Sequence, residues 1–275
     1  MNREGRETLQ KAILYILMAI VITIILFPII WMSLTAFKND RDILSIPPKI
    51  LFIPTLENFD FVFKHSNIVK GLINSLITAI AVIAITIPVG LLAAYSLARY
   101  NVGGGHLAFY ILTIKMFPPI AAIIPYFVIF RNLGLLDNLA SLILLNSLFN
   151  LPFTTWLLMS FIKEIPTDLE EAAMIAGATR FEAFREVILP LLRPALAVTA
   201  IFAGIFTWNE FLFAYIITRT EALTITRVMA GFFTERGILW GPLSACALIA
   251  TIPMFVLALA TQKYIVRGLT LGAVK

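Results

Sequence analysis

The sequence predicts an all-α integral membrane protein with six transmembrane helices. Of its 275 residues, 60% are hydrophobic and only 13% are charged, against roughly a quarter charged in a soluble domain. The apolar residues fall into separate stretches of about twenty, the length that a helix needs to cross a hydrocarbon core of about 30 Å. Alternating segments of about ten residues, typical of a membrane β-barrel, do not occur.

The six spans are expected at residues 12–36, 71–98, 107–130, 139–162, 195–217 and 243–265. The first span is expected to be retained, because its apolar run continues to about Thr35 without a small-residue cleavage site. The loop 37–70 is expected to fold into a small helical cap. Several spans contain proline, which kinks a helix by removing one hydrogen bond; these prolines are Pro28, Pro88, Pro118, Pro119, Pro125, Pro152 and Pro253.

The charges indicate orientation and exclude other classes of protein. Six spans place both termini on one side, and Arg3, Arg6 and Lys11 before the first span favour a cytoplasmic location for that side. The formal charge of +5 does not predict nucleic-acid binding, because the basic residues are scattered among the loops. Cys246 is the only cysteine, so no internal disulfide can form.

The loop 163–194 has strong helix-start signals. Thr167 precedes Glu170 by three residues and Asp168 precedes Glu171 by three, and each pair fits a capping box at the start of a helix. Gly177 fits the left-handed residue that ends such a helix. The residues between them form an apolar stripe at helical spacing: Leu169, Ala172, Ala173 and Ala176.

A second short helix is expected directly after this corner. Thr179 and Glu182 repeat the capping-box pattern, and Pro190 is expected to end the helix. The product is a small-faced knob that another protein can approach closely, with Glu170 and Glu171 adding negative charge near a helix N-terminus. The alternative is an amphipathic helix resting on lipid, but a face made mainly of alanine offers little area for anchoring.

This loop resembles the signature loop, or EAA motif, of permease subunits of bacterial and archaeal ABC importers. The resemblance rests on Glu171-Ala172-Ala173, Gly177-Ala178, Ile188-Leu189-Pro190 and Pro194. Over essentially the whole chain, further segments resemble the carbohydrate-uptake branch of MalG-type permeases: Asn74-Ser75, Lys115 to Pro119, Trp208 to Phe211, and Gly268 to Lys275. Lys115 departs from this pattern, because arginine is more often expected there, and lysine lacks the planar fork of arginine.

The resemblance implies a type I ABC importer permease fold with a cytoplasmic coupling-helix loop. It divides the chain into a first helix with an external loop at 1–70, a permease domain at 71–265 and a cytoplasmic tail at 266–275. The residues implied to contact the ATPases are Glu170, Glu171, Ala172, Ala173, Gly177, Ala178, Leu189 and Pro190. The residues implied to make tail contacts are Gly268, Thr270 and Gly272.

The implied assembly contains this chain, a MalF-like second permease, two MalK-like ATPase subunits and an extracellular sugar-binding protein, in the cell membrane of a bacterium or archaeon. The chain is expected to be a transport subunit and not an enzyme. It lacks the phosphate-binding sequence GxxxxGK[ST], so ATP and Mg²⁺ are expected on the partner ATPases and no cofactor on this chain. No metal site is expected, since His65 and His106 lie in loops without ligand partners.

Two charged residues, Lys115 and Glu210, fall within apolar spans. Each costs about 2.5 to 3.5 kcal/mol at a helix centre, so both are expected to face the bundle interior or a water-filled cavity, where they can pair. One interpretation has them line the sugar path with Trp208 and Asn209. The alternative is a structural network that holds helices together, which is also the expectation for Asn146 and Asn150.

Two other functions stay open at this level. A stand-alone secondary transporter or channel would typically show internal repeats of several spans, and none is evident. An ABC importer for a non-sugar solute, such as phosphate or a peptide, is the other. The segment Trp208 to Phe211 and the tail favour a sugar, such as the disaccharides maltose or trehalose or an oligosaccharide.

Overall fold

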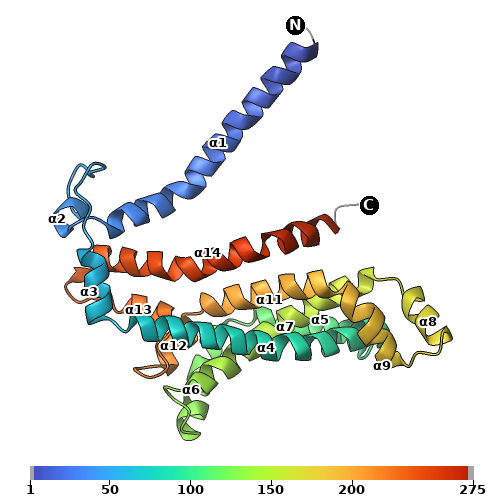
Figure 1. The fold of residues 1–275 in the computed structure, drawn as a ribbon. Helices are drawn as coiled ribbons and strands as arrows, with labels where there is room; N and C mark the ends of the chain where they lie inside the picture. The colour runs from blue at the N-terminus through green and yellow to red at the C-terminus, as the bar shows by residue number, and fades with distance from the viewer. Residues whose placement is uncertain (1–2, 272–275) are drawn as a thin grey trace. The chain divides into compact units, whose positions relative to one another are not determined.

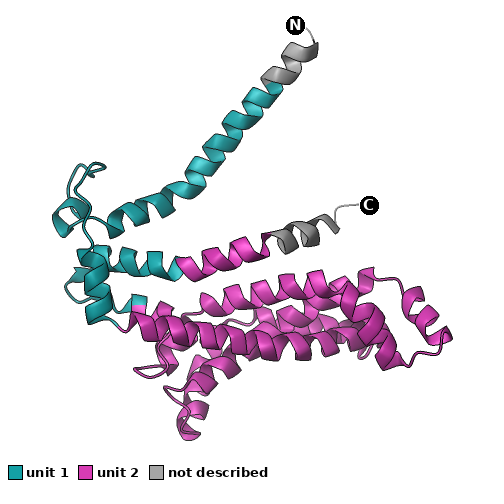
Figure 2. Cartoon of the chain, viewed as in Figure 1, with its two compact units in different colours: residues 1–66, 229–251 teal, residues 67–228, 252–275 magenta. Residues whose placement is uncertain are grey.

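The computed structural model describes residues 3–271, and the described chain is mostly helical. It divides into two compact units, shown in Figure 2. Unit 1 contains Met1–Ser66 and Met229–Thr251, and unit 2 contains Asn67–Val228 and Ile252–Lys275.

Unit 1 joins the first long helix to a small cap. Its elements are α1 (Arg3–Ala36), α2 (Asp40–Ile43), α3 (Glu57–His65), a hairpin of β1 (Phe233–Thr234) and β2 (Gly237–Ile238), and the start of α14 (Trp240–Leu271). The helical cap predicted for the loop 37–70 is therefore confirmed. The buried Asn58 amide donates to the carbonyls of Ala36 and Lys38, at 3.0 and 2.7 Å, which fixes α3 against the end of α1.

Unit 2 is built on two long helices that run in the same direction, α4 (Ile68–Tyr100) and α7 (Leu139–Glu164), with α11 (Arg193–Trp208) beside them (Figure 1). Close packing of α4 and α7 depends on Gly90, where a Cβ atom would lie 2.7 Å from Thr154 Cγ2. The other elements are α5 (Gly104–Met116), η1 (Pro119–Ala122), α6 (Ile123–Asn132), α8 (Asp168–Ile175), α9 (Arg180–Ala183), η2 (Phe184–Ile188), α10 (Leu189–Leu191), α12 (Leu212–Ile217) and α13 (Ile225–Ala230), which ends beyond the unit boundary.

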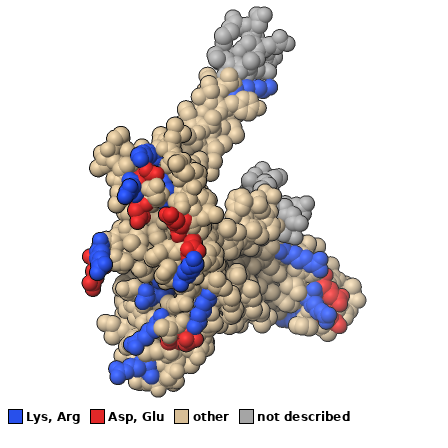
Figure 3. Space-filling model, turned by 60° about the vertical axis from the view of Figure 1, so that its left-hand side comes forward, with Lys and Arg blue, Asp and Glu red and all other residues tan. Residues whose placement is uncertain are grey.

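Among the residues that the structure describes, four helices are long and apolar enough to cross a membrane: Gln10–Ala36, Ile68–Tyr100, Leu139–Glu164 and Trp240–Gln262. Two bent pairs raise the number to six, as predicted, if each pair is one span. They are Gly104–Met116 with Pro119–Asn132, bent by 83°, and Arg180–Leu191 with Arg193–Trp208, bent by 70°. On the face shown in Figure 3, charged side chains gather in groups separated by uncharged surface, as expected of segments that lie in lipid.

Two of the predicted spans are not continuous helices. The span predicted at 107–130 breaks after Met116, because Pro118 and Pro119 cannot donate the hydrogen bonds that would continue α5. The span predicted at 195–217 ends at Trp208 and resumes as α12 at Leu212. Both breaks fall in segments where a charged residue, Lys115 or Glu210, interrupts an apolar span.

Candidate functional site

The helix predicted from the loop 163–194 is α8, but it does not begin with a capping box. Thr167 already has helical backbone angles, φ −63° and ψ −28°, and its side chain makes no capping bond. Glu170 turns away from the helix start and accepts hydrogen bonds from Tyr95 Oη, at 2.7 Å, and from Arg99 Nε. The prediction of a capping box here is wrong, because the charged side chain of Arg99 binds the carboxylate instead.

The two neighbouring glutamates of α8 have opposite surroundings. Glu170 is buried, with 8% of its surface exposed, whereas Glu171 is exposed. The predicted apolar stripe is open rather than packed, since Leu169, Ala172 and Ala176 are exposed and Ala173 is half-buried. Ile175 is 87% exposed. Within unit 2, α8 therefore presents a face of small residues that the rest of the unit leaves uncovered.

Gly177 ends α8 as the sequence predicts. Its φ of +98° lies in the left-handed region, and a Cβ atom added there would meet nothing within 4 Å. The N–H of Gly177 donates to Met174 O and the N–H of Ala178 donates to Ala173 O, both at 3.0 Å. These two bonds form a Schellman motif, which fixes a sharp corner after the helix.

The second helix begins with the predicted capping box. Glu182 N donates to Thr179 Oγ1, and Thr179 N donates to Glu182 Oε2 at 2.7 Å. The helix ends one residue after the predicted stop at Pro190, at the end of α10, and the sharp bend comes at Leu192; Leu189 and Pro190 are half-buried.

A polar hollow of about 220 Å³ lies between the end of α4, α8 and α9. Its lining includes both glutamates of α8 and two arginines, and the full set is Tyr95, Arg99, Tyr100, Thr167, Glu170, Glu171, Met174, Arg180 and Ala183. Arg180 lies over the Tyr100 ring, 5.6 Å from its centroid. The open alanine face and this hollow together form a candidate docking surface for another protein.

The residues predicted for a solute path are divided between two helix breaks. Lys115 Nζ donates to Phe149 O at 3.2 Å and lies 4.7 Å from the centroid of the Phe206 ring. Glu210 accepts from Phe213 N and Ala214 N, at 2.7 and 3.2 Å, so its carboxylate caps α12. Among the described residues Lys115 and Glu210 form no ion pair with each other, since each binds backbone groups nearby.

Trp208 and Asn209 also differ in their surroundings. Trp208 is buried, with 6% exposed, whereas Asn209 is exposed and donates to Ile205 O at 2.9 Å. A separate cavity of about 350 Å³ near Lys115 is lined mainly by aromatic side chains: Tyr110, Thr113, Ile114, Phe117, Tyr126, Leu148 and Phe149. Asn150 donates to Asn146 O at 2.8 Å and reaches Thr207 Oγ1 at 3.4 Å, in agreement with a packing role.

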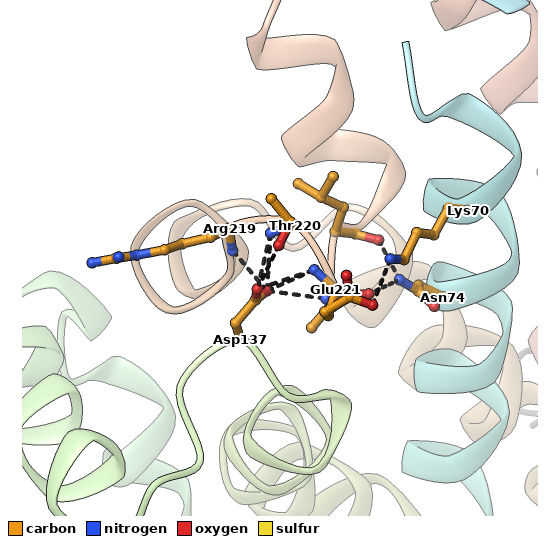
Figure 4. Close-up of polar contacts among 8 residues, drawn as sticks. Lys70, Asn74, Asp137, Arg219, Thr220 and Glu221 are labelled. Atoms are coloured by element: carbon orange, nitrogen blue, oxygen red, sulfur yellow. Dashed lines mark hydrogen bonds and ion pairs between the residues drawn. The ribbon is translucent and has the colours of Figure 1, made fainter.

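Sequence reasoning missed a second polar cluster at the other end of unit 2, shown in Figure 4. The carboxylate of Asp137 accepts hydrogen bonds from four successive backbone N–H groups, those of Arg219, Thr220, Glu221 and Ala222. Burial alone would raise the pKa of Asp137, but these four donors hold it well below its usual range. No local pattern in the sequence links position 137 to residues about 80 positions later.

The same loop is tied to the start of α4. Lys70 Nζ pairs with Glu221 at 2.7 Å, and the Asn74 amide donates to the carbonyls of Glu221 and Leu223, both at 2.9 Å (Figure 4). Ser75 Oγ accepts from Ile225 N at 2.9 Å. The pair Asn74-Ser75 thus anchors the chain between α12 and α13.

The predicted tail contacts lie at the edge of the described chain. Gly268 and Thr270 fall within α14, and Gly272 lies outside the described residues.

The fold and the corner after α8 can now be compared with known proteins. A family model described as "Binding-protein-dependent transport system inner membrane component" matches residues 86–271. The chain belongs to this family. The resemblance inferred from the sequence is therefore confirmed, and the chain is a membrane-embedded permease subunit of an ABC importer.

Relatives and solved structures agree with this membership. The chain is 38% identical over 276 residues to the trehalose/maltose transport system permease protein MalG of Thermococcus litoralis, covering 98% of this chain and 99% of that protein. It is 37% identical to the trehalose transport system permease protein SugB of Mycobacterium tuberculosis, covering 94% and 96%. A chain of a bacterial ABC transporter involved in the import of alginate, 22% identical, superposes with a TM-score of 0.73 over 96% of this permease and 98% of that chain. The type I permease fold is thus confirmed.

Proposed function

We propose that this permease carries a sugar, most simply a disaccharide or oligosaccharide such as trehalose or maltose, across the cell membrane. The observation that supports the substrate class is full-length similarity to permeases whose names state trehalose, maltose and diacetylchitobiose as cargo. Because the similarity covers 94% and 98% of the chain for the trehalose and maltose relatives, it includes the membrane segments that would line a path.

We propose that α8 and its Gly177 corner form the coupling element that contacts an ATPase subunit. The open face of Ala172 and Ala176, the exposed carboxylate of Glu171 and the neighbouring hollow support this role. A small-residue face lets a partner approach closely, and the Schellman motif keeps the corner rigid, so that a push on α8 moves the chain on both sides. ATP and Mg²⁺ would be bound by the partner subunits.

In the proposed assembly the chain pairs with a MalF-like second permease, two MalK-like ATPases and an external sugar-binding protein. Both termini and α8 would face the cytoplasm. Support comes from the basic residues before α1 and from the coupling role proposed for α8, since ATP is consumed in the cytoplasm.

We propose that the solute path runs along the two helix breaks, near Lys115 and Asn209. The aromatic cavity beside Lys115 supports this, because aromatic faces and lysine or amide donors are the groups that bind sugar rings and hydroxyls. Glu210 and Trp208 would act indirectly. Glu210 holds the start of α12 and Trp208 forms the end of α11 at the break.

The direct test is transport by the reconstituted complex. The chain, its partner permease, the ATPases and the binding protein are placed in liposomes, and ATP-dependent uptake of labelled trehalose, maltose, phosphate and a dipeptide is measured. Uptake of a sugar alone is the expected result. Uptake of phosphate or the dipeptide without any sugar would disprove the substrate class.

Orientation has its own test. In a Cys246→Ala background, Glu57→Cys should react with a membrane-impermeant thiol reagent in intact cells, and Arg180→Cys should react only after the cells are opened. Reaction of Arg180→Cys from outside would reverse the proposed topology.

A further inference from the structure

The network around Glu170 connects α8 to a helix far from it in the sequence. Among the described residues, both hydrogen bonds that join α8 to α4 end on the Glu170 carboxylate, one from Tyr95 Oη at 2.7 Å and one from Arg99 Nε. Arg99 Nη2 also donates to Ile165 O, at 2.9 Å, directly after α7 ends. The last turn of α4 thus holds both ends of the short segment between α7 and α8.

This network is buried, unlike the surface beside it. The side chains of Arg99 and Glu170 have 8% and 10% of their surface exposed. A buried ion pair keeps its geometry because separating the charges would leave each without a partner in a poorly solvated place. The link between α8 and α4 is therefore stiff, whereas the exposed side chain of Glu171 is free to meet another protein.

Tyr95 extends the link to a third element. It lies one turn before Arg99 on α4, and its ring packs against Phe184 of η2 with centroids 4.7 Å apart. Phe184 belongs to a buried cluster that also contains Leu91 and Ala94 of α4 and Leu158 and Ile162 of α7. A displacement of α8 that moves Tyr95 and Arg99 would thus move α4 and α7 together.

We propose that Glu170 is a positioning residue that ties α8 to α4 through Arg99 and Tyr95, so that ATP-driven movement of α8 displaces the α4 and α7 pair instead of being absorbed in the loop 165–167. The inference rests on the proposed coupling role of α8. In this proposal the two adjacent glutamates have different roles. Glu171 faces the ATPase, and Glu170 binds α4.

The test measures sugar transported per ATP hydrolysed by the whole complex in liposomes, together with the amount of ATPase subunit that copurifies. In Glu170→Gln the ATPase content stays normal, because the Glu170 carboxylate is occupied by Tyr95 and Arg99 and the exposed Glu171 is unchanged, and the sugar-to-ATP ratio falls about threefold or more. Glu186→Gln removes an exposed carboxylate of η2 and serves as the matched control, with the ratio unchanged.

A double-mutant comparison separates the link from a general loss of stability. If Glu170 acts through Arg99, the double variant Glu170→Gln/Arg99→Gln has about the same ratio as the worse single variant, because one interaction cannot be lost twice. Tyr95→Phe, which removes only one donor, lowers the ratio less. If Glu170→Gln does not accumulate in the membrane, the sugar-to-ATP ratio of Tyr95→Phe tests the link instead.

Two outcomes overturn the inference. A normal sugar-to-ATP ratio in Glu170→Gln or, if that protein does not accumulate, in Tyr95→Phe shows that the link transmits nothing. Loss of ATPase subunits from Glu170→Gln places Glu170 at the partner contact. Glu171→Lys and Gly177→Asp, measured beside them, test the coupling role of α8 itself. If those two variants transport normally, the proposed function of α8 fails, irrespective of Glu170.

Discussion

The two ends of unit 2 each gather hydrogen bonds on one carboxylate, but the donors differ in kind. Asp137 accepts from four backbone N–H groups of residues 219–222, near the start of α4. Glu170 accepts from the side chains of Tyr95 and Arg99, near the end of α4. Lys70 and Arg99 are 29 positions apart in α4, which separates these ends by roughly 43 Å of helix.

This difference indicates different roles. Backbone donors fix the path of the chain whatever side chains the loop carries. The loop 219–222 at the Asp137 end is therefore held in one conformation. Side-chain donors connect two particular helices and leave the outer face of α8 open. One end is therefore organised to hold its shape, and the other to receive a partner and move with it.

The largest expected effect comes from Gly177, and Gly134 provides a matched control. Both have positive φ, +98° and +68°, and at both an added Cβ meets nothing within 4 Å. Aspartate therefore introduces similar backbone strain, about 1–2 kcal/mol, at each position. Gly177→Asp should release the ATPase subunits or uncouple hydrolysis from transport, whereas Gly134→Asp should retain both. Copurified ATPase and sugar uptake are the measurements, and equal losses in the two variants would show that strain alone explains them.

Asp137→Ala should give the largest loss of stability among simple loop variants. It leaves four N–H groups without their acceptor and places alanine at a φ of +56°. We expect a loss of about 2 kcal/mol, since hydrogen bonds to charged groups contribute about 1.5–3 kcal/mol and this site is partly solvated. Thermal unfolding in detergent measures it. An unchanged melting temperature would mean that other contacts hold the loop 219–222.

Acid should weaken the Asp137 end by a predictable route. Because the pKa of Asp137 is lowered by folding, its contribution is fully present above the unfolded value of about 3.9 and is lost as the pH falls further. Asp137→Asn tolerates the positive φ but carries no charge. The difference in melting temperature between wild type and Asp137→Asn should be constant above pH 5 and shrink below about pH 4. A constant difference throughout would contradict the lowered pKa.

Lys70→Ala should have the smallest effect, although it also breaks an ion pair. The side chains of Lys70 and Glu221 are 39% and 74% exposed, and exposed pairs contribute about 0–1 kcal/mol. We expect a change of about 0.5 kcal/mol or less in the free energy of unfolding. A loss as large as that of Asp137→Ala would mean that the pair organises the loop.

Much of the fold was predictable from the sequence because its signals are local. Apolar length gave the spans, Gly177 gave the left-handed corner, and Thr179 with Glu182 gave the second capping box. Some errors arise where a distant residue competes with a local pattern. Arg99 is 71 positions from Glu170 and removes it from the expected capping box, and the N–H groups of 219–222 find Asp137 across a similar gap.

The internal hydrogen bonds of α1 bear on how the protein is made. Across Gln10–Ala36 the most apolar window has no buried residues, and the hydroxyls of Thr23, Ser33 and Thr35 each bond to a carbonyl four residues earlier in the same helix. A helix whose polar groups are satisfied internally is stable alone in lipid. During synthesis α1 can therefore leave the translocon and remain stable in the bilayer before any later helix emerges. The order in which the helices pack need not follow the order in which they insert.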